Sequence, residues 1–419
     1  MKTQQLLFGA AIVATAFASC KKDETKPSDT PTTPVSKKDT LSGEVSGTWE
    51  KSSMHFIKGD IFIAEGKSLI IEEGVTIVMD PSVKPEFIIK GNLYAMGTAA
   101  APVTFTVPDG NKAQFGDQWG GLMAGPTCKE LLLDHVIMEQ GGAVTTEQSS
   151  SVKAGFYKAE AGEHVPVLWY GGDGKLVVTN STIRNFNEDG MYIEGGDVLV
   201  SNNMIHTTGV AGGDAINIKS GVHADIAFNV IYSPNTNGLK LSNSGDRPRQ
   251  AYVIGYNNTI LNAGWRRPTT KGGSIWLEKS IQADLYNNLL VNDRYGVKRD
   301  KGNPEDSRSK ISNTYYYGFT KECVDQFQPT DEIVAGVNGD IRGINAGEND
   351  PQFENYSLST DMANADFNAS WDMHLKATSP ALTGGKTDFT RHFSGGITMN
   401  GKAYTSPAPQ AYYGALGKK

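Results

Sequence analysis

The chain has 419 residues and a formal net charge of −7, from 39 Lys and Arg against 46 Asp and Glu. Its 47 glycines, together with many Asn, Thr and Val residues, indicate a β protein with many tight turns. No cluster of Lys and Arg lies on a predicted helix, so the sequence gives no electrostatic footprint for nucleic acid and we expect no such partner.

The first 19 residues predict a signal peptide. Lys2 precedes an apolar run from Leu6 to Phe17, and small residues lead from there to Cys20. The run is too short to cross a bilayer as a helix. The segment AFASC at 16–20 resembles the lipobox of bacterial lipoproteins, in which the cysteine is diacylated and becomes the mature N-terminus. The resemblance implies lipidation at Cys20 and membrane contact through this anchor only.

Residues 20–40 predict a disordered tether. After Cys20 the sequence is KKDETKPSDTPTTPVSKKDT, in which Val35 is the one apolar residue apart from proline, so the segment cannot bury a core. Lys and acidic residues directly after the cysteine resemble the surface-export signal of Bacteroides-group lipoproteins. This resemblance implies an outer-membrane lipoprotein exposed on the cell surface.

Cysteine and histidine usage predicts no metal site. Cys128 and Cys323 lie far apart in the chain, and two separate buried thiols are favoured over a disulfide or a metal pair. The seven histidines are scattered without a pair at ligand spacing, and no acidic loop resembles a calcium-binding hand. We therefore expect no cofactor, with Ca²⁺ as the exception if the protein is a lyase.

Internal repeats dominate the middle of the chain. GGDGKLVVTNSTI at 171–183 recurs as GGDVLVSNNMI at 195–205, and weaker copies follow. The alignment places one Asn per copy at an equivalent position, with spacings of 22, 27, 28 and 30 residues. These residues are Asn180, Asn202, Asn229, Asn257 and Asn287.

A second recurring segment alternates apolar and polar side chains, as in DGMYIEG from 189 and DAINIKSG from 214. It predicts short strands with one buried face, and no amphipathic helix separates them. Strands that recur every 22–30 residues stack in parallel when the chain coils. The sequence therefore predicts an all-β, right-handed parallel β-helix over 41–345 with an internal Asn ladder and terminal caps. Residues 346–419 are expected to form a closing coil and cap.

Several segments resemble extracellular right-handed β-helix repeat proteins of bacteria, in the pectin-lyase-like superfamily. GDIFIAEGKSLIIEEGVTIVM and LLLDHVIMEQGG resemble the N-terminal half of such proteins, and DPQFENYSLS resembles their terminating region. The resemblance implies the fold but not the activity, because the superfamily contains lyases, hydrolases, epimerases and adhesins. The Gly-His-Gly and Arg-Ile-Lys strings of polygalacturonases are absent from this sequence. The Arg-x-Pro-x-x-Arg turn of pectate lyases is absent too.

The strand alternation also predicts which side chains face outward. With Met191, Ile193, Ile216, Ile218, Leu239, Leu241, Ile275 and Leu277 in the core, their neighbours must face solvent. One outward row then contains Tyr192, Asn217, Lys240, Trp276 and Lys298. The next contains Tyr170, Glu194, Lys219, Ser242, Glu278 and Asp300.

These rows suit carbohydrate, because aromatic faces stack on sugars while amide and ionic groups bind hydroxyl and carboxylate groups. The alternative is an ordinary mixed β surface. Two long turns flank the rows and carry Arg247, Arg249, Arg266 and Arg267, which suit a uronate carboxylate or a sulfate unless they are merely solvated charges. The polar loop at 141–155 is expected to be solvated.

The sequence favours a monomeric surface lipoprotein that captures or adheres to a polysaccharide without catalysis. The first alternative is a polysaccharide lyase-like or glycosidase-like enzyme acting on an acidic polysaccharide, with catalytic candidates Lys219, Lys240, Lys298, Glu278 and Asp300. The second is a structural or protein-binding solenoid. A catalytic site should gather charged groups with perturbed pKa values in a cleft beside the rows.

Overall fold

The computed structural model describes residues 38–419 except 211, 270 and 394–395. The predicted signal peptide, Cys20 and most of the predicted tether lie outside the described residues. The first strand, β1 (Lys38–Glu44), begins inside the range predicted as tether. None of the described helices is long and apolar enough to cross a membrane.

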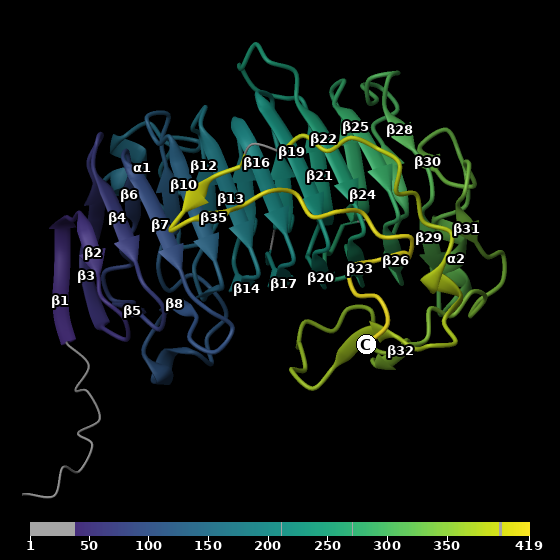
Figure 1. Ribbon diagram of the computed structural model, residues 1–419, viewed down its shortest axis with the longest axis horizontal. Coiled ribbons are helices and arrows are strands. Elements are labelled where there is room, and N and C mark those ends of the chain that lie inside the picture. The colour runs from purple at the N-terminus through teal and green to yellow at the C-terminus, as the bar shows by residue number, and fades with distance from the viewer. Residues whose placement is uncertain (1–37, 211, 270, 394–395) are drawn as a thin grey trace, which may run out of the picture. The chain divides into compact units, whose positions relative to one another are not determined.

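Short strands stack in parallel along one axis and form the three faces of a β-helix (Figure 1). Face I contains β6 (Phe87–Ile89), β9 (Leu122–Ala124), β12 (Leu168–Tyr170), β15 (Met191–Ile193), β18 (Ile216–Ile218), β21 (Asn237–Ser242), β24 (Gly273–Glu278) and β27 (Val297–Arg299). Face II contains β2 (Gly47–Trp49), β4 (Ser68–Ile71), β7 (Asn92–Met96), β10 (Glu130–Asp134), β13 (Lys175–Thr179), β16 (Gly196–Ser201), β19 (Val222–Ala227), β22 (Tyr252–Tyr256), β25 (Gln282–Tyr286) and β28 (Lys310–Ile311).

Face III contains β5 (Thr76–Met79), β8 (Val103–Thr106), β11 (Val136–Glu139), β14 (Thr182–Phe186), β17 (Met204–Thr208), β20 (Val230–Tyr232), β23 (Thr259–Leu261), β26 (Leu289–Val291), β29 (Tyr315–Tyr317) and β31 (Ile341–Arg342). The longer strand β3 (Met54–Ile63) pairs with β5 and with β6, so it bridges faces III and I. Each coil of the chain thus runs from face I to face II to face III.

The core is a stack of inward side chains along each face. Met191, Ile216, Leu239 and Ile275 occupy one row of face I and are at most 1 % exposed. Each such side chain stabilises the fold by roughly 1.5–3 kcal/mol through burial. All eight residues predicted from the alternation to face the core are buried, which confirms the predicted strand orientation.

An Asn ladder runs along the inside of the turn between faces II and III. The Nδ2 groups of Asn203, Asn229 and Asn258 each donate to the Oδ1 of the next ladder residue, at 2.9–3.0 Å, and the last acceptor is Asn288. Each Oδ1 also accepts a backbone N–H from the preceding coil. The ladder therefore satisfies polar groups that would otherwise be buried without partners.

The ladder is predicted correctly, but four of its five assigned residues are wrong. Asn180, Asn202, Asn257 and Asn287 occupy the position one residue earlier, where φ lies between 50° and 57°. Asn tolerates this left-handed backbone better than most residues, which explains the repeated Asn there. The alignment slipped at Asn229 because Phe228 takes the left-handed position in that coil.

The C-terminal end of the core is covered by residues 321–335. The helix α2 (Lys321–Gln326) supplies Val324, and Phe327, Ile333 and Ala335 pack on the same core cluster. The strand β30 (Ile333–Val334) pairs antiparallel with β27. These residues shield the last coil from solvent.

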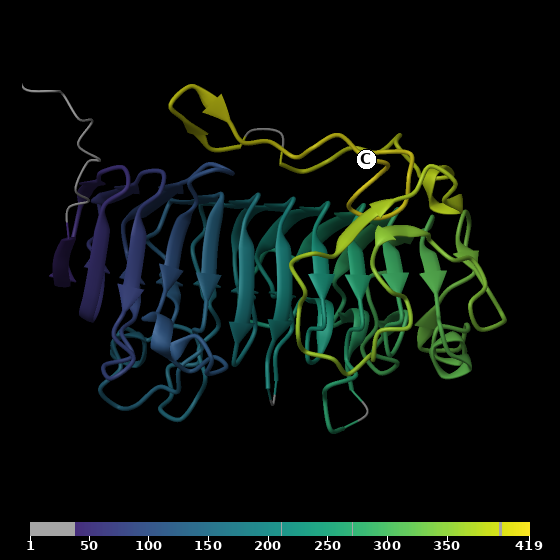
Figure 2. The same cartoon turned by 90° about the horizontal axis from the view of Figure 1, so that it is seen from below.

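Residues 346–419, expected to be a closing coil and cap, lie outside the coils. They include the pairs β32 (Phe353–Asn355) with β33 (Asp372–Leu375) and β34 (Thr398–Met399) with β35 (Lys402–Ala403). The part that contains β32 and β33 packs against face III, and the part that contains β34 and β35 runs back along face II as a strap, drawn yellow in Figures 1 and 2. Asp134 accepts hydrogen bonds from Lys402 Nζ and Tyr404 Oη at 2.6 and 2.9 Å, which fixes the strap to β10.

We predict that Asn229→Ala lowers the free energy of unfolding by about 2–4 kcal/mol, because both neighbours in the ladder lose a buried partner. Urea or thermal unfolding followed by circular dichroism measures this change. Asn338→Ala, at an exposed loop position, is the matched control and should be nearly neutral. Equal midpoints for the two variants would contradict a stabilising ladder.

Candidate functional site

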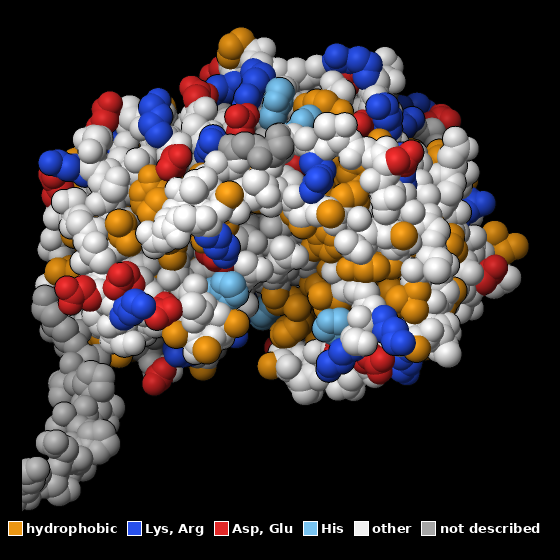
Figure 3. Space-filling view, viewed as in Figure 1, with side chains coloured by type: hydrophobic (Ala, Val, Ile, Leu, Met, Phe, Trp, Pro, Cys, Tyr) orange, Lys and Arg blue, Asp and Glu red, His pale blue; other side chains and the backbone are white. Residues whose placement is uncertain are grey.

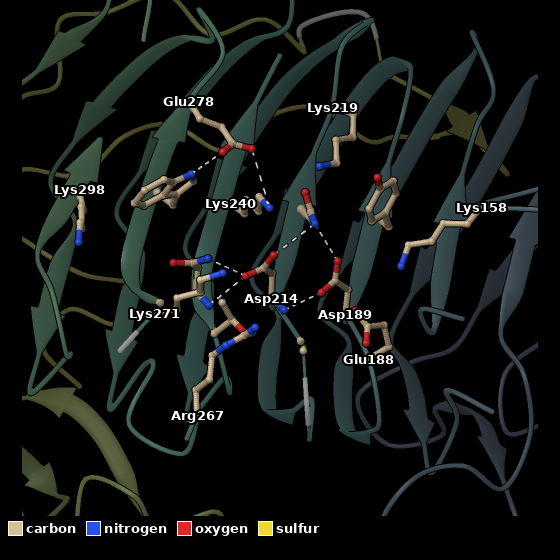
Figure 4. Close-up of a pocket in the computed structure, with 18 of the residues that line it drawn as sticks. Lys158, Glu188, Asp189, Asp214, Lys219, Lys240, Arg267, Lys271, Glu278 and Lys298 are labelled. Atoms are coloured by element: carbon tan, nitrogen blue, oxygen red, sulfur yellow. Dashed lines mark hydrogen bonds and ion pairs between the residues drawn. The ribbon is translucent and has the colours of Figure 1, made fainter. Parts of the chain in front are cut away.

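A cleft of about 520 Å³ lies on the outer surface of face I (Figure 4). It is lined by Tyr157, Lys158, Glu188, Asp189, Tyr192, Gly212, Gly213, Asp214, Asn217, Lys219, Thr236, Asn237, Lys240, Arg267, Lys271, Gly272, Trp276, Glu278 and Lys298. The strands β15, β18, β21, β24 and β27 supply the floor. The turns that connect face III to face I supply one side, and the loop at 140–167 supplies one end.

The first predicted outward row forms the floor of the cleft. Parallel pairing places Tyr192, Asn217, Lys240, Trp276 and Lys298 opposite one another on successive strands. All five line the cleft, and so do three other predicted residues, Lys219, Arg267 and Glu278. The structure thus brings together eight of the predicted site residues, whereas their role in binding stays a prediction.

The outward position of Tyr170 is wrong. Tyr170 pairs with the core residue Ile193 and is fully buried, so it cannot face a ligand. Trp169 takes the outward position beside Tyr192 and donates Nε1–H to Glu194 at 2.8 Å. Glu194 is held by this bond and does not line the cleft.

Four other predicted residues have partners away from the cleft. Arg247 and Arg249 lie on the turns between faces I and II, where they pair with Asp173 and Asp197. Arg266 is half-buried and donates to the carbonyl oxygens of residues 208, 209 and 233. Asp300 accepts the N–H of Gly302 at 2.8 Å in a turn.

Sequence reasoning missed three acidic residues at the side of the cleft, Glu188, Asp189 and Asp214. Asp189 and Asp214 occupy the same place in successive coils, two residues before the inward residues Met191 and Ile216. They were visible as the first residues of the recurring segments DGMYIEG and DAINIKSG. Strand alternation assigns faces only to residues within the strand, so it gives no information on the position that precedes each strand.

Hydrogen bonds hold these carboxyl groups in a second polar ladder. Asp189 Oδ1 accepts the N–H of Asp214 at 2.6 Å, and Asp214 Oδ1 accepts both the N–H and the side-chain amide of Asn237. Asn217 Nδ2 donates to Asp189 at 2.8 Å and to Asp214 at 3.2 Å. One amide therefore bridges the two carboxyl groups from the floor of the cleft.

Asn217 itself has an unsatisfied acceptor. Its side chain is only 4 % exposed, and its Oδ1 has no hydrogen-bond partner within the described part of the chain. Buried acceptors of this kind are rare in folded proteins. A donor group from a bound ligand would satisfy it.

Burial raises the pKa of all three carboxyl groups. The pKa of Glu188 rises to about 7, and Asp214 and Glu163 add to the effect. The pKa of Asp189 is held well above its ordinary value by burial and by Asp214. Burial also raises the pKa of Asp214, but Lys240 and the amide of Asn237 oppose that effect. Unlike Asp214, Glu188 receives no hydrogen bond from any described residue that would stabilise its charged form.

Cationic and aromatic groups surround the acidic cluster. Lys240 lies 3.8 Å from Glu278, which also accepts the Nε1–H of Trp276 at 2.8 Å. Lys298 Nζ lies 5.9 Å from the centre of the Trp276 ring. Burial, with help from Lys240, lowers the pKa of Lys219, whose Nζ lies 5.0 Å from the Tyr192 ring centre.

The loop at 140–167, which includes α1 (Ser150–Lys153), folds back on face I. Residues 141–155 were expected to be solvated, yet Ser151 is buried and donates from both its N–H and its hydroxyl group to Glu86. Tyr157 and Lys158 of this loop reach the cleft. The bonds of Ser151 could not be predicted from the polar composition of the loop, because their acceptor, Glu86, lies far away in the sequence.

The remaining sequence predictions concern metals and thiols. Across the described residues, no three His, Cys, Asp or Glu side chains are placed to hold a metal ion together. Cys128 and Cys323 are separate buried thiols, which confirms that prediction.

Residues 167–324 match a family model described as a right-handed beta helix region. The match covers most of the coils that form the cleft. Together with the parallel pairing it establishes the right-handed parallel β-helix that the sequence predicts. The comparisons with curated proteins and with solved structures found no match.

We predict that Glu188→Gln stabilises the fold at pH 8 by roughly 1–3 kcal/mol and leaves stability unchanged at pH 4. The folded-state pKa is about 7 against an ordinary value of 4.5. The wild-type protein therefore loses stability as the pH rises through this interval, and Gln cannot ionise. Thermal unfolding at both pH values measures the difference. The exposed Glu65→Gln is the control, and a Glu188→Gln midpoint unchanged at pH 8 would contradict a raised pKa.

Proposed function

We propose that the protein binds an anionic polysaccharide in the face I cleft and hydrolyses its glycosidic bonds. One observation carries the proposal: three carboxyl groups with raised pKa values meet beside a row of lysine and aromatic side chains. Perturbed titratable groups that gather in a cleft are typical of catalytic sites. The cluster favours catalysis over the non-catalytic capture that the sequence alone favoured.

The charge of the cleft supports an acidic substrate. Its lining carries six cationic side chains, those of Lys158, Lys219, Lys240, Arg267, Lys271 and Lys298. The lining has only four acidic side chains, those of Glu188, Asp189, Asp214 and Glu278, so positive groups outnumber negative ones even when all four are ionised. Carboxylate or sulfate groups on a glycan would offset this positive charge.

The aromatic side chains support a sugar rather than another anion. Trp276 is partly exposed and is fixed by its hydrogen bond to Glu278. Its ring, like that of Tyr192, offers an apolar face next to polar groups, the arrangement on which sugar rings stack. The row continues over successive coils, which matches a polymer better than a single small ligand.

Hydrolysis requires a general acid and either a general base or a nucleophile, and different residues of the acidic cluster suit these two roles. Glu188, with a pKa of about 7 and no donor among the described residues, suits the general acid that protonates the glycosidic oxygen. Asp214 accepts three N–H donors and faces Lys240, so it is the better place for the negative charge. It would take a proton from water as the water oxygen bonds to the anomeric carbon, or would attack that carbon itself.

β-Elimination is the second candidate, and Lys219 favours it. Its lowered pKa increases the fraction of neutral amine, the form that can accept a sugar proton next to a carboxylate group. Glu188 would again protonate the leaving oxygen. An unsaturated product would distinguish elimination from hydrolysis.

Attachment to the outer surface of the outer membrane through a lipid on Cys20 is part of the same proposal. It rests on the resemblance of residues 16–20 to a lipobox. The tether predicted for residues 20–40 would let the cleft reach extracellular polysaccharide.

We predict that Glu188→Gln reduces product release from an acidic polysaccharide by about 10²–10⁴-fold while binding is retained, because only proton donation is lost. The assay incubates the protein with uronate-rich and sulfated polysaccharides and follows reducing ends and unsaturated-product absorbance. The exposed Glu65→Gln should keep wild-type activity. Activity retained in Glu188→Gln would exclude its role as the acid, and binding without any product would support capture instead.

We predict that Trp276→Ala weakens polysaccharide binding about tenfold, the loss expected when a stacked ring is removed. Trp276→Phe keeps an aromatic face and should recover most of the affinity. Isothermal titration with an acidic oligosaccharide measures both variants. Unchanged affinity in Trp276→Ala would place the ligand elsewhere.

A further inference from the structure

We infer that the cleft is closed at one end and receives the end of a polysaccharide chain, so that short products are released from chain ends. This inference rests on the proposed function. It deepens that proposal by stating which part of the polymer is recognised.

The outer surface of face I is covered on the N-terminal side of the cleft. Parallel pairing continues the row of Tyr192 through Trp169, Met123 and Ile88. These three side chains face outward, yet they are only 4 %, 0 % and 2 % exposed. A polymer lying along the row therefore cannot continue past Tyr192.

The loop at 140–167 supplies the cover. The Phe156 ring lies 5.0 Å from the Trp169 ring, and Val165 belongs to the same buried cluster. Gly125 makes room for this contact, since a Cβ atom there would lie 2.2 Å from the Phe156 ring. The apolar underside of the loop therefore packs on the sheet.

Tyr157 forms the wall at the closed end. Its ring meets the Tyr192 ring edge-on, with 5.1 Å between the centroids. Two serines in the first turn of α1 anchor the loop to the coils, and bonds of Thr145 join its two arms. Ser150 donates to Asp60, Ser151 donates to Glu86, and the Thr145 hydroxyl donates to the carbonyl oxygens of residues 160 and 163. These bonds make the wall a fixed part of the fold.

The acidic cluster lies next to this wall. Glu188 and Asp189 precede β15, the strand that carries Tyr192, and Asp214 precedes the next strand, β18. Figure 4 shows Lys158, Glu188 and Asp189 at one side of the view and Lys298 at the other. At about 4.8 Å per coil, the row from Tyr192 to Lys298 extends roughly 19 Å away from the wall. Only a short piece of the polymer fits between the wall and the acidic cluster, and the rest must lie toward Trp276 and Lys298.

The test is the size of the products over time. The protein is incubated with a uronate polymer, and products are separated by chromatography while viscosity is followed. We expect mono- or disaccharides from the earliest samples, with viscosity falling slowly. Early oligomers of mixed size with a fast fall in viscosity would overturn this inference and leave the proposed function standing. Absence of any product from all acidic polymers tested would overturn both.

Tyr157→Ala tests the wall itself. Loss of the ring opens the closed end, so we expect longer products and a several-fold rise in the ratio of viscosity loss to reducing ends. Tyr295→Ala, beside Lys298 at the opposite end of the cleft, is the matched control and should keep the product sizes of the wild-type protein.

Discussion

Parallel hydrogen bonding between successive coils is the constraint on which the rest of the structure depends. It sets one side chain per coil in each row, at a spacing of about 4.8 Å, and alternation then decides which rows face the core. The apolar rows fill the interior, and the Asn ladder provides hydrogen-bond partners for the buried polar groups of one turn. The row from Tyr192 to Lys298 forms the floor of the face I cleft. A change of register by one residue would exchange the surface row with the core row.

The same stacking places the acidic residues where they oppose stability. Asp189 and Asp214 repeat at one position, so their carboxyl groups come close and are buried together. Burial and mutual repulsion raise their pKa values. The hydrogen-bond donors of the polar ladder offset only part of this destabilisation of the charged carboxylates. A structural ladder could use Asn at every such position, as it does at Asn237. The retained acids therefore favour a chemical role, which the raised pKa of Glu188 also suits.

Local periodicity made much of this predictable. The alternation of DAINIKSG predicts that Ile216 faces inward and Asn217 outward, because the period of two is a property of the strand itself. Tyr170 was assigned wrongly because its strand, at Leu168–Tyr170, has bulky residues at all three positions and no alternation to align.

Long-range contacts were not predictable in the same way. The wall at Tyr157 depends on Glu86 and Asp60, and the strap depends on Asp134 and Asp225, all distant in sequence from their partners. Likewise, no local pattern reveals that Arg247 and Arg249 turn toward Asp173 and Asp197 rather than toward the cleft. The composition predicts long polar loops, but it does not predict which face of the β-helix each loop packs against.

The most direct test of the account is a structure of the Glu188→Gln variant with an acidic oligosaccharide bound. The account predicts sugar rings on Tyr192 and Trp276, acidic groups beside Lys240 and Lys298, and a glycosidic oxygen within hydrogen-bond distance of residue 188. An oligosaccharide bound outside the cleft, or one whose glycosidic oxygens all lie beyond the reach of residue 188, would contradict it.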